Sequence, residues 1–424
     1  MNFNGLTIVD KQLVEAARRE VREIFPETPL QLNEHLSRRY GASIWLKRED
    51  LSPVRSYKIR GAFNFLRKAV AKAGKDKVFV CASAGNHAQG FAFACRHFGV
   101  HGVVFMPVTT PQQKIEKTRI FGGEFIKIRL VGDIFDQCYA AARQHVQDHD
   151  GYMVPPFDHE DIIEGQATVA AEIMDQLPEG TKPDIVVMPV GGGGLSAGLT
   201  GFLAGTVKKE NFVFCEPEGA PSLKKSLERG EPVTLNKVDN FVDGAAVARI
   251  GDLNFKALKD FPAEQVMLIP ENAICVTIIE MLNLEGVVLE PAGALSIAAL
   301  ERLGRERLEG KTVIAVVSGG NFDFERLPDV KERAMRYTGV KKYFILRLPQ
   351  RPGALRDFLN LLGPDDDIAR FEYLKKSARN FGSILIGIET NAQENFAGLL
   401  ERFEAAGLGY EDITENDILS NLII

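Results

Sequence analysis

The sequence predicts an α/β protein whose main part is a doubly wound, mostly parallel sheet, followed by a smaller α+β module of ferredoxin-like order. From about residue 77 onward, short β-branched runs alternate with longer helical patterns, which is typical of βαβ units. After about residue 339 the pattern changes to the order β-α-β-β-α, which indicates a separate ferredoxin-like module.

The first strand–helix pairs lie between residues 77 and 147 and follow an expected helix over 61–73. Proline is favoured at the first position of a helix, so Pro111 marks the start of the second helix of this series, and Gly122 and Gly123 end it. We expect strand 77–82 with helix 86–97, strand 102–107 with helix 111–122, and strand 125–130 with helix 133–147.

Two later strands have the near-continuous apolar sequence of strands that are covered on both faces. Strand 184–190 precedes four glycines and a helix over 195–205, and strand 311–317 ends in a glycine-rich turn. A further strand is expected at 212–215. Ligands of doubly wound folds bind at the carboxyl ends of the strands, so the polar loops that follow these strands are candidate binding loops.

The C-terminal module has strands expected at 343–348, 368–374 and 383–390 and helices at 354–362 and 394–406. A helix over 325–336 precedes it. We therefore predict a first domain over 1–336, with a smaller subdomain inserted at about 54–155. A linker at 337–340 would lead to the second domain, 341–424.

Composition excludes several classes of protein. The 424 residues are 45% hydrophobic and 25% charged, as in ordinary soluble proteins. A net charge of −6 gives no electrostatic reason to expect nucleic acid or an anionic membrane as a partner. The start of the chain is polar and does not resemble a signal peptide. Because the five cysteines are scattered, we expect reduced thiols and a cytoplasmic location.

Lys58 lies in the run Ser-Tyr-Lys-Ile-Arg-Gly, directly before the helical pattern 61–73. The neighbouring cations Arg55 and Arg60 and the helix N-terminus disfavour an ammonium, which helps a lysine act as a neutral nucleophile. Such an amine can form a Schiff base. The alternative is a solvated lysine at the start of a surface helix, and Lys58 taken alone does not decide between them.

The turn Ser83, Ala84, Gly85, Asn86 follows a predicted strand and precedes a helix. Backbone N–H groups at a helix N-terminus bind carboxylates, and the Asn86 side chain offers a hydrogen-bond donor. Serine and asparagine are also ordinary turn and cap residues, so this loop carries weight only together with others.

The four glycines 191–194 follow a buried strand and precede a helix. Their unhindered N–H groups can point at one anion, which favours phosphate binding. A plain turn is the alternative, but four glycines carry a high entropic cost merely to change direction. A dinucleotide fingerprint also remains open for this loop taken alone.

Ser318 ends the last long strand and precedes Gly319, Gly320 and Asn321. A hydroxyl facing a pyridine nitrogen would leave the ring largely neutral, which favours prompt loss of a β-leaving group, whereas an aspartate would keep the nitrogen protonated. A turn serine is the alternative. An amine, a ring-hydroxyl donor, a phosphate cradle and this hydroxyl are together the groups needed to hold pyridoxal 5′-phosphate.

The motifs S-Y-K-I-R-G, S-A-G-N-H-A-Q-G, G-G-G-G-L and S-G-G-N occur in this order. With them the chain resembles the β-family, or fold type II, of pyridoxal-phosphate enzymes, whose architecture is like that of tryptophan synthase β. More narrowly it resembles the short biosynthetic threonine dehydratases (threonine ammonia-lyases), which carry one C-terminal ACT-like regulatory domain. The resemblance covers residues 1 to about 335 and 341–424.

The resemblance implies a role for each loop. Lys58 would be the Schiff-base lysine and the catalytic residue, and the turn 83–86 would hold the substrate carboxylate. The cofactor would be bound by Lys58, by Asn86 at the ring hydroxyl, by Gly191, Gly192, Gly193, Gly194 and Leu195 at the phosphate, and by Ser318 at the pyridine nitrogen.

Other polar residues received weaker assignments. Relatives such as serine racemase hold a divalent cation near positions 216, 220 and 222; Glu216 and Ala220 are in register, but the third is Ser222, so we expect no metal site. We interpret His87 as a helix-start residue rather than a catalyst. Glu290 can either face the cofactor or simply start a helix.

The resemblance implies dehydration and deamination of L-threonine to 2-oxobutanoate and ammonia, the entry to isoleucine biosynthesis, in a homotetramer inhibited by isoleucine and relieved by valine. The alternatives within the same chemistry are a serine-preferring dehydratase, a racemase or a β-replacement enzyme. A non-catalytic amino-acid or nucleotide sensor is the alternative from another class. For the C-terminal module alone, the alternative to regulation is a passive role in oligomerisation.

Overall fold

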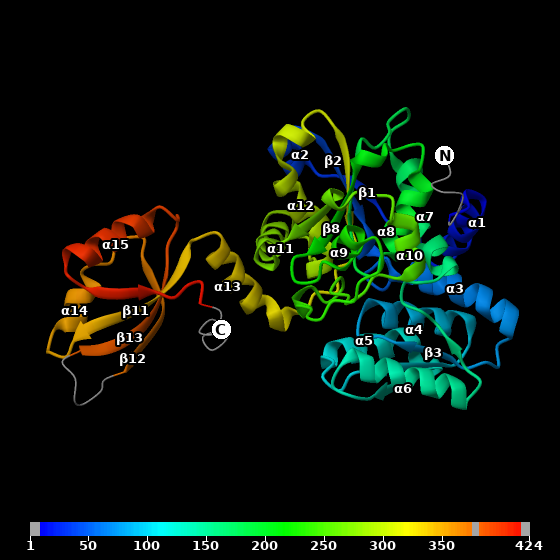
Figure 1. The fold of residues 1–424 in the computed structure, drawn as a ribbon, viewed down its shortest axis with the longest axis horizontal. Coiled ribbons are helices and arrows are strands. Elements are labelled where there is room, and N and C mark those ends of the chain that lie inside the picture. The colour runs from blue at the N-terminus through cyan, green and yellow to red at the C-terminus, as the bar shows by residue number, and fades with distance from the viewer. Residues whose placement is uncertain (1–8, 375–380, 417–424) are drawn as a thin grey trace. The chain divides into compact units, whose positions relative to one another are not determined.

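The structure is a computed structural model of the chain and describes residues 9–374 and 381–416 (Figure 1). The ends of the two predicted domains, 1–8 and 417–424, lie outside the described residues, as does the segment 375–380. The chain forms two compact units, Met1–Asp323 and Phe324–Ile424. Of the helices in the described part, none has the length and apolar sequence needed to cross a membrane.

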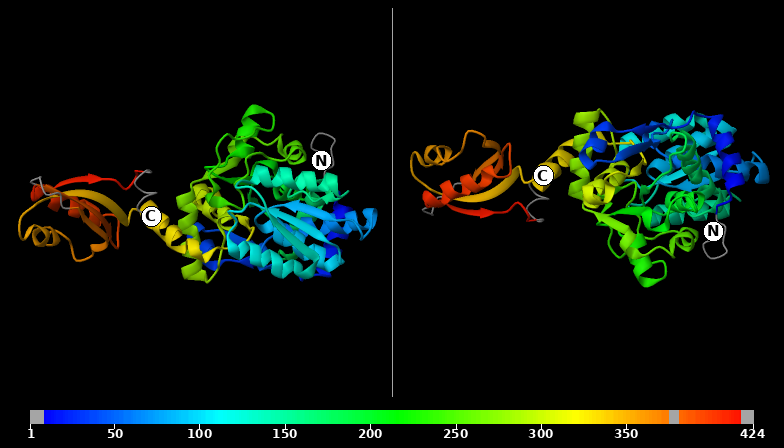
Figure 2. Two further views of the ribbon diagram at one scale, coloured as in Figure 1. Left: turned by 90° about the horizontal axis from the view of Figure 1, so that it is seen from below. Right: turned by 90° about the horizontal axis from the view of Figure 1, so that it is seen from above.

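The elements of both units can be followed in Figures 1 and 2. The strands of the first unit are β1 (Leu30–Leu32), β2 (Ser43–Arg48), β3 (Phe79–Ala82), β4 (Gly102–Met106), β5 (Ile126–Leu130), β6 (Tyr152–Met153), β7 (Ile185–Pro189), β8 (Phe212–Pro217), β9 (Val266–Ile269) and β10 (Thr312–Val317). Its helices are α1 (Lys11–Arg22), α2 (Glu34–Tyr40), α3 (Lys58–Ala73), α4 (Asn86–Phe98), α5 (Gln112–Gly122), α6 (Phe135–Asp148), α7 (Glu160–Gln176), α8 (Gly194–Leu203), α9 (Ser222–Arg229), α10 (Asp252–Leu258), α11 (Glu271–Glu285) and α12 (Pro291–Leu308). The second unit contains α13 (Leu327–Tyr337), β11 (Lys341–Pro349), α14 (Ala354–Leu359), β12 (Asp367–Leu374), β13 (Phe381–Glu389), α15 (Asn395–Ala405) and β14 (Gly409–Asp412).

The larger sheet of the first unit has the strand order β1-β2-β10-β7-β8-β9. The strands β2, β10, β7, β8 and β9 pair in parallel, and β1 pairs antiparallel with β2 at one edge. Helices α7, α8 and α10 pack on the face that Val186 and Met188 present. Helix α12 also contacts β7, β8, β9 and β10, but its residues do not belong to the hydrophobic core that α7, α8 and α10 form on that face. The sheet is therefore wound with helices as predicted.

The smaller sheet has the order β5-β4-β3-β6, and all its pairs are parallel. Alternate residues of β3 face opposite sides: Phe79 and Cys81 join a core with helix α4, while Val80 and Ala82 pack on helix α6. These strands lie between residues 79 and 153, inside the segment 54–155 that we assign to a subdomain.

The second unit has an antiparallel sheet in the order β12-β13-β11-β14. Phe344 and Ile386 of this sheet pack against Phe396 and Phe403 of α15, which gives the ferredoxin-like arrangement expected. β14 adds a strand beyond the predicted order. The predicted fold class is confirmed for both parts of the chain.

Helix α13 belongs to the second unit, whereas the predicted first domain, 1–336, includes it. Its Glu332 accepts a hydrogen bond from the Tyr343 hydroxyl at 2.9 Å and pairs with the Lys341 ammonium at 2.5 Å. These contacts tie the helix to β11. The compact units consequently divide at Asp323 and not at residue 336.

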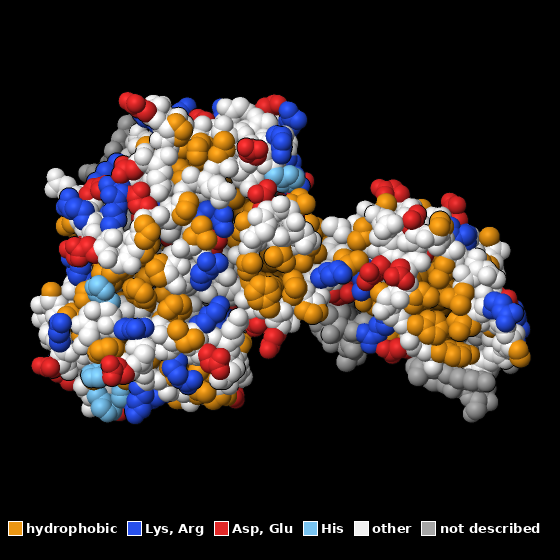
Figure 3. Space-filling model, turned by 180° about the vertical axis from the view of Figure 1, so that it is seen from behind, with side chains coloured by type: hydrophobic (Ala, Val, Ile, Leu, Met, Phe, Trp, Pro, Cys, Tyr) orange, Lys and Arg blue, Asp and Glu red, His pale blue; other side chains and the backbone are white. Residues whose placement is uncertain are grey.

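Charged side chains of both signs are interspersed over the face shown in Figure 3. This distribution agrees with the mixed composition of the chain.

Candidate functional site

The structure brings the four predicted loops together at the carboxyl ends of the strands. The 83–86 turn follows β3, the glycine loop follows β7, and Ser318 follows β10. The Lys58 segment joins them because Ser56 forms a β-bridge with Gly319. Such an edge is the usual ligand site of a doubly wound fold.

Lys58 is the first residue of α3, and its ammonium donates a hydrogen bond to the carbonyl oxygen of Pro156 at 3.1 Å. The rings of Tyr57 and Phe157 flank it, with centroids 5.3 and 5.8 Å from Nζ. Burial lowers the pKa of Lys58 to about 8, although the Glu290 carboxylate opposes this shift. The amine therefore loses its proton more readily than an exposed lysine does, although the ammonium still predominates at pH 7.

One of the two predicted causes of this low pKa, the neighbouring cations, was wrong. We expected neighbouring cations to disfavour the ammonium, but the Arg60 guanidinium is bound by two buried carboxylates, Glu49 and Glu172. Removal of the Lys58 amine from water is what lowers its pKa.

The Asn86 side chain is held at both ends of its amide. Nδ2 donates to the Glu290 carboxylate at 2.6 Å, and Oδ1 accepts from Asn321 Nδ2 at 2.7 Å. Because an amide nitrogen has two hydrogens, one remains for a further acceptor.

The turn that contains Ser83, Ala84 and Gly85 is partly exposed and leads directly into α4. Ser83 Oγ accepts the N–H of Gly85 at 3.2 Å, which shapes the turn. A partly exposed turn at a helix N-terminus is suited to a small carboxylate. Its role in substrate binding remains a prediction.

The glycine loop packs so tightly that its residues must be glycine. A Cβ on Gly192 would lie 2.2 Å from the Phe157 ring, and one on Gly194 would lie 2.9 Å from the Phe157 carbonyl oxygen. Gly193 has φ of 89°, in the left-handed region. Asn254 also holds the loop, since its Nδ2 donates to the Gly192 carbonyl at 2.6 Å.

The backbone N–H groups of this loop fit a phosphate. Residues 192–195 are buried, and within the described part of the chain the amides of 191–195 donate to no protein acceptor. Buried amides without acceptors are costly, and here they stand at the N-terminus of α8, where an anion would satisfy them. Pyridoxal phosphate therefore fits this loop.

Ser318 is 2% exposed, and its hydroxyl donates to the carbonyl oxygen of Ala292 at 3.1 Å. Its own carbonyl accepts the N–H of Tyr57 at 3.1 Å, next to Lys58. The structure thus places Ser318 beside the lysine segment, as the motif order implies. Its contact with a pyridine nitrogen remains a prediction.

Three site residues lacked a decisive sequence signal. The sequence around Glu290 fits two interpretations, and the structure places its carboxylate against Asn86, where burial raises its pKa to about 7. Phe157 and Asn254, which shape the glycine loop, were not predicted. The clusters Phe-Asp-His at 157–159 and Asp-Leu-Asn at 252–254 follow no recognisable strand in the sequence.

His87 and Glu216 have structural partners. Burial lowers the pKa of His87 to about 3, and its Nε2 lies 3.1 Å from the Val154 carbonyl oxygen. The Glu216 carboxylate accepts the N–H groups of Leu223 and Lys224 at 2.6 and 3.0 Å, which caps α9. The carboxylate oxygens of Glu216 are therefore engaged by the N-terminus of α9.

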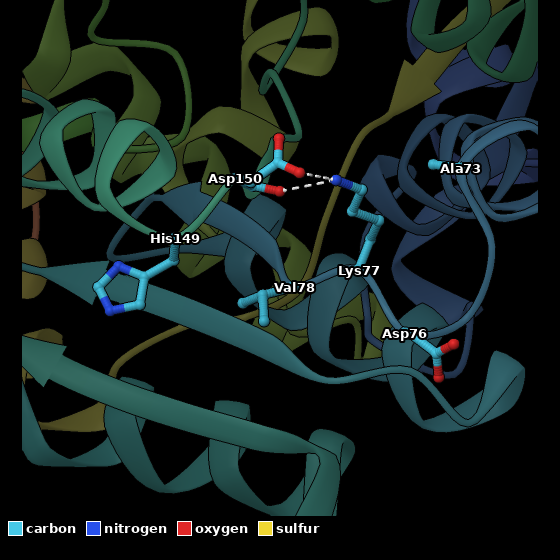
Figure 4. A pocket seen from close by; sticks show the side chains of 6 residues that line it. All are labelled: Ala73, Asp76, Lys77, Val78, His149 and Asp150. Atoms are coloured by element: carbon cyan, nitrogen blue, oxygen red, sulfur yellow. Dashed lines mark hydrogen bonds and ion pairs between the residues drawn. The ribbon is translucent and has the colours of Figure 1, made fainter.

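A surface hollow of about 330 Å³ lies at the other end of β3 (Figure 4). Lys77 reaches across it to the backbone oxygen and the carboxylate of Asp150. It contains none of the predicted site residues. Its lining consists of Ala73, Asp76, Lys77, Val78, His149 and Asp150.

Comparison with known proteins shows the family. Residues 21–319 match the family described as pyridoxal-phosphate dependent enzyme, and residues 332–423 match the C-terminal regulatory domain of threonine dehydratase. The biosynthetic L-threonine dehydratase IlvA of Halalkalibacterium halodurans is 42% identical over 409 residues, which cover 96% of this chain and 97% of that protein. The chain belongs to the threonine dehydratase family.

Other members of this family agree. The IlvA protein of Bacillus subtilis is 42% identical over 419 residues, which cover 99% of this chain and 98% of the relative. Threonine deaminase isoform 2 of Solanum lycopersicum, in its processed form, has a TM-score of 0.69 and 35% identity over 77% of this chain and 94% of that one. The fold type II architecture, the pyridoxal-phosphate dependence and the regulatory C-terminal domain are thus those of the threonine dehydratase family.

Proposed function

We propose that this chain converts L-threonine to 2-oxobutanoate and ammonia, the entry step of isoleucine biosynthesis, with pyridoxal phosphate bound at Lys58. The observation that carries the proposal is the set of acceptor-free amides at 191–195, of which residues 192–195 are buried, together with the low-pKa amine of Lys58. Membership of the threonine dehydratase family supports the choice of substrate.

Bound pyridoxal phosphate supplies an electron sink that acidifies the Cα proton of an attached amino acid. The residues of this chain would bind the cofactor, orient the substrate and move the proton. The amides of 191–195 bind the phosphate, and Asn86 donates to the ring hydroxyl. The turn 83–86 holds the substrate carboxylate, which fixes the Cα proton near Lys58. The substrate amine would displace Lys58 from the cofactor, and the freed Lys58 amine, whose pKa burial lowers to about 8, would take that proton.

Ser318 favours elimination over other outcomes. A hydroxyl does not hold a proton on the pyridine nitrogen as a carboxylate would. The cofactor would then be a weaker electron sink, which would favour prompt loss of the β-hydroxyl. The hydroxyl would leave with a proton as water, and another water would hydrolyse the released enamine to the 2-oxoacid and ammonia.

The first experiment is an absorption spectrum of the purified protein, followed by addition of L-threonine and assay of 2-oxobutanoate. We expect a band near ~410–420 nm, typical of a cofactor attached to lysine, and product formation. Lys58→Ala should lose both, whereas Lys72→Ala, an exposed lysine on the same helix, should lose neither. Turnover that survives in Lys58→Ala would overturn the assignment.

The alternative is an enzyme that prefers L-serine. L-Serine lacks one methyl group of L-threonine, and one such group is worth about 1–3 kcal/mol of discrimination between substrates. We therefore propose comparing kcat/KM for L-threonine and L-serine in the same preparation and testing for D-serine formation. A higher value for L-serine, or racemisation faster than deamination, would move the function to the related activities.

The regulatory domain supports control by an effector. Isoleucine as inhibitor, valine as its antagonist, a homotetrameric assembly and a cytoplasmic location are proposed from the family resemblance. A coupling free energy of about 1–3 kcal/mol between effector and substrate is typical of such control.

A further inference from the structure

Four side chains form a continuous hydrogen-bonded chain across the site. Lys117 of α5 donates to Asn321 Oδ1 at 3.3 Å, and Asn321 Nδ2 donates to Asn86 Oδ1 at 2.7 Å. Asn86 Nδ2 donates to Glu290 Oε1 at 2.6 Å. These residues come from widely separated parts of the chain, so only the fold brings them together.

This chain permits a single orientation of the Asn86 amide. The Asn321 Nδ2 is a donor, so it must meet the amide oxygen, and the Glu290 oxygen that faces Asn86 is an acceptor, so it must meet the amide nitrogen. A rotation of the amide by 180° would place two donors together at one end and two acceptors at the other. The Asn321 amide is itself oriented, because its Nδ2 also donates to the Val54 carbonyl at 2.8 Å.

Glu290 is well placed for this role because it is only 5% exposed. Its carboxyl keeps an acceptor oxygen for Asn86 in either protonation state. The charged and titratable groups around it are Asp243, Lys114, Lys117, Lys58 and Tyr57.

We propose that Glu290 and Asn321, with Lys117 behind them, are positioning residues that hold the Asn86 amide so that its second Nδ2 hydrogen is directed at the ring hydroxyl of the cofactor. This rests on the proposed function, since it takes Asn86 as a cofactor contact. Loss of either neighbour removes one of the two contacts that hold the amide, so its second Nδ2 hydrogen is no longer directed at the ring hydroxyl and that hydrogen bond is lost.

The test measures cofactor affinity, which does not depend on turnover. Apoenzyme is titrated with pyridoxal phosphate, and the Kd is read from the absorption band. We expect Glu290→Ala and Asn321→Ala each to weaken binding about tenfold, as for one hydrogen bond of this kind. Glu290→Gln should stay close to the unaltered protein, because its amide oxygen still accepts from Asn86.

The decisive arm uses an Asn86→Ala background. If Glu290 and Asn321 act through Asn86, their alanine variants should not weaken binding further in that background, since effects on one shared contact are not additive. Full additivity there, or an unchanged Kd for both single variants, would overturn the inference.

Glu216→Ala is the matched control, because Glu216 is also a buried carboxyl with a pKa of about 7 but caps α9. It should lower the thermal stability of the apoenzyme and leave the Kd near that of the unaltered protein. A Kd as weak as that of Glu290→Ala would assign the effect to lost stability and reject the inference. Absence of any cofactor band in the unaltered protein would instead reject the proposed function.

Discussion

The Phe157 ring occupies the space that any side chain on Gly192 would need. Replacement of Gly192 by alanine must therefore push the ring, which flanks Lys58, or shift the glycine loop. Overpacking of this kind typically costs about 1–3 kcal/mol. We expect Gly192→Ala to lower the free energy of unfolding by that amount and to weaken binding of pyridoxal phosphate, measured by denaturant titration and by absorbance.

Gly398 provides the control for this substitution. It lies within α15, where a Cβ would meet only the flexible end of Arg402 at 3.4 Å. Gly398→Ala should raise stability slightly, by about 0.5–1 kcal/mol, because alanine favours helix. Unaltered cofactor affinity in Gly192→Ala would contradict the role given to this packing.

Among the single residues of the site, sequence analysis predicted those that stand in a short, recognisable motif. Lys58, Asn86, the four glycines and Ser318 each stand in a short motif after a strand or before a helix. Glu290 does not, since its partner Asn86 lies 204 residues away and only the fold brings the two together. Long-range contacts of this kind have no local pattern to read.

Helix α3 is fastened to α7 and to the segment after β2 by buried ion pairs. The Arg60 guanidinium contacts the Glu49 and Glu172 carboxylates at 2.7 Å each. Thr28 and Thr168 complete its hydrogen bonds at 3.0 Å. Because Arg60 lies two residues from Lys58, this network also fixes where the reactive amine stands.

Arg60→Met should destabilise the protein by about 3–5 kcal/mol, because it leaves Glu49 buried without its ion-pair partner and leaves Glu172 with Lys47 alone. The measurement is the free energy of unfolding of the apoenzyme in urea. Arg67→Met, on the same helix but partly exposed, should cost well below that. Equal losses in the free energy of unfolding for the two substitutions would show that the buried network stabilises the protein no more than an exposed ion pair does.

Glu172 makes part of this stability pH-dependent. Burial alone would raise the pKa of its carboxyl, but Arg60 and Lys47 outweigh burial and lower the pKa to about 2, below the ordinary 4.5. A lowered folded-state pKa means that the stabilisation is complete above the ordinary value and is lost as pH falls toward 2. Between pH 5 and 3, the free energy of unfolding should fall less steeply for Glu172→Gln than for the unaltered protein; parallel curves would contradict this.

Buried ion pairs also explain why strand β2 was not predicted from the sequence. β2 ends in Lys47 and Arg48, and Glu49 follows, so the run reads as solvated and gave no strand prediction. All three side chains are buried because they are paired. By contrast β7 is apolar throughout and was predicted within a residue or so of its observed ends.

For the whole molecule, the position of α13 changes the design of a truncation. A fragment that ends after Tyr337 keeps this helix without β11, whose Lys341 and Tyr343 side chains bind its Glu332. A fragment that ends at Asp323 follows the division between compact units. We expect the shorter fragment to retain threonine deamination and to be insensitive to isoleucine.

The measurement is deaminase activity of both fragments and the full chain over a series of isoleucine concentrations. The full chain should be inhibited. Inhibition that persists in a soluble, active fragment ending at Asp323 would place the effector site outside the C-terminal unit.

The strand order of the larger sheet also governs when the protein can finish folding during its synthesis. β10 lies between β2 and β7, so the centre of the sheet stays open until almost the last residues of the first unit have been made. Cofactor loading must therefore follow nearly complete synthesis of that unit. The second unit, roughly a hundred residues, then takes on the order of 5–20 s to translate. Because the second unit is made last, the larger sheet has this time to close while the chain is still attached to the ribosome.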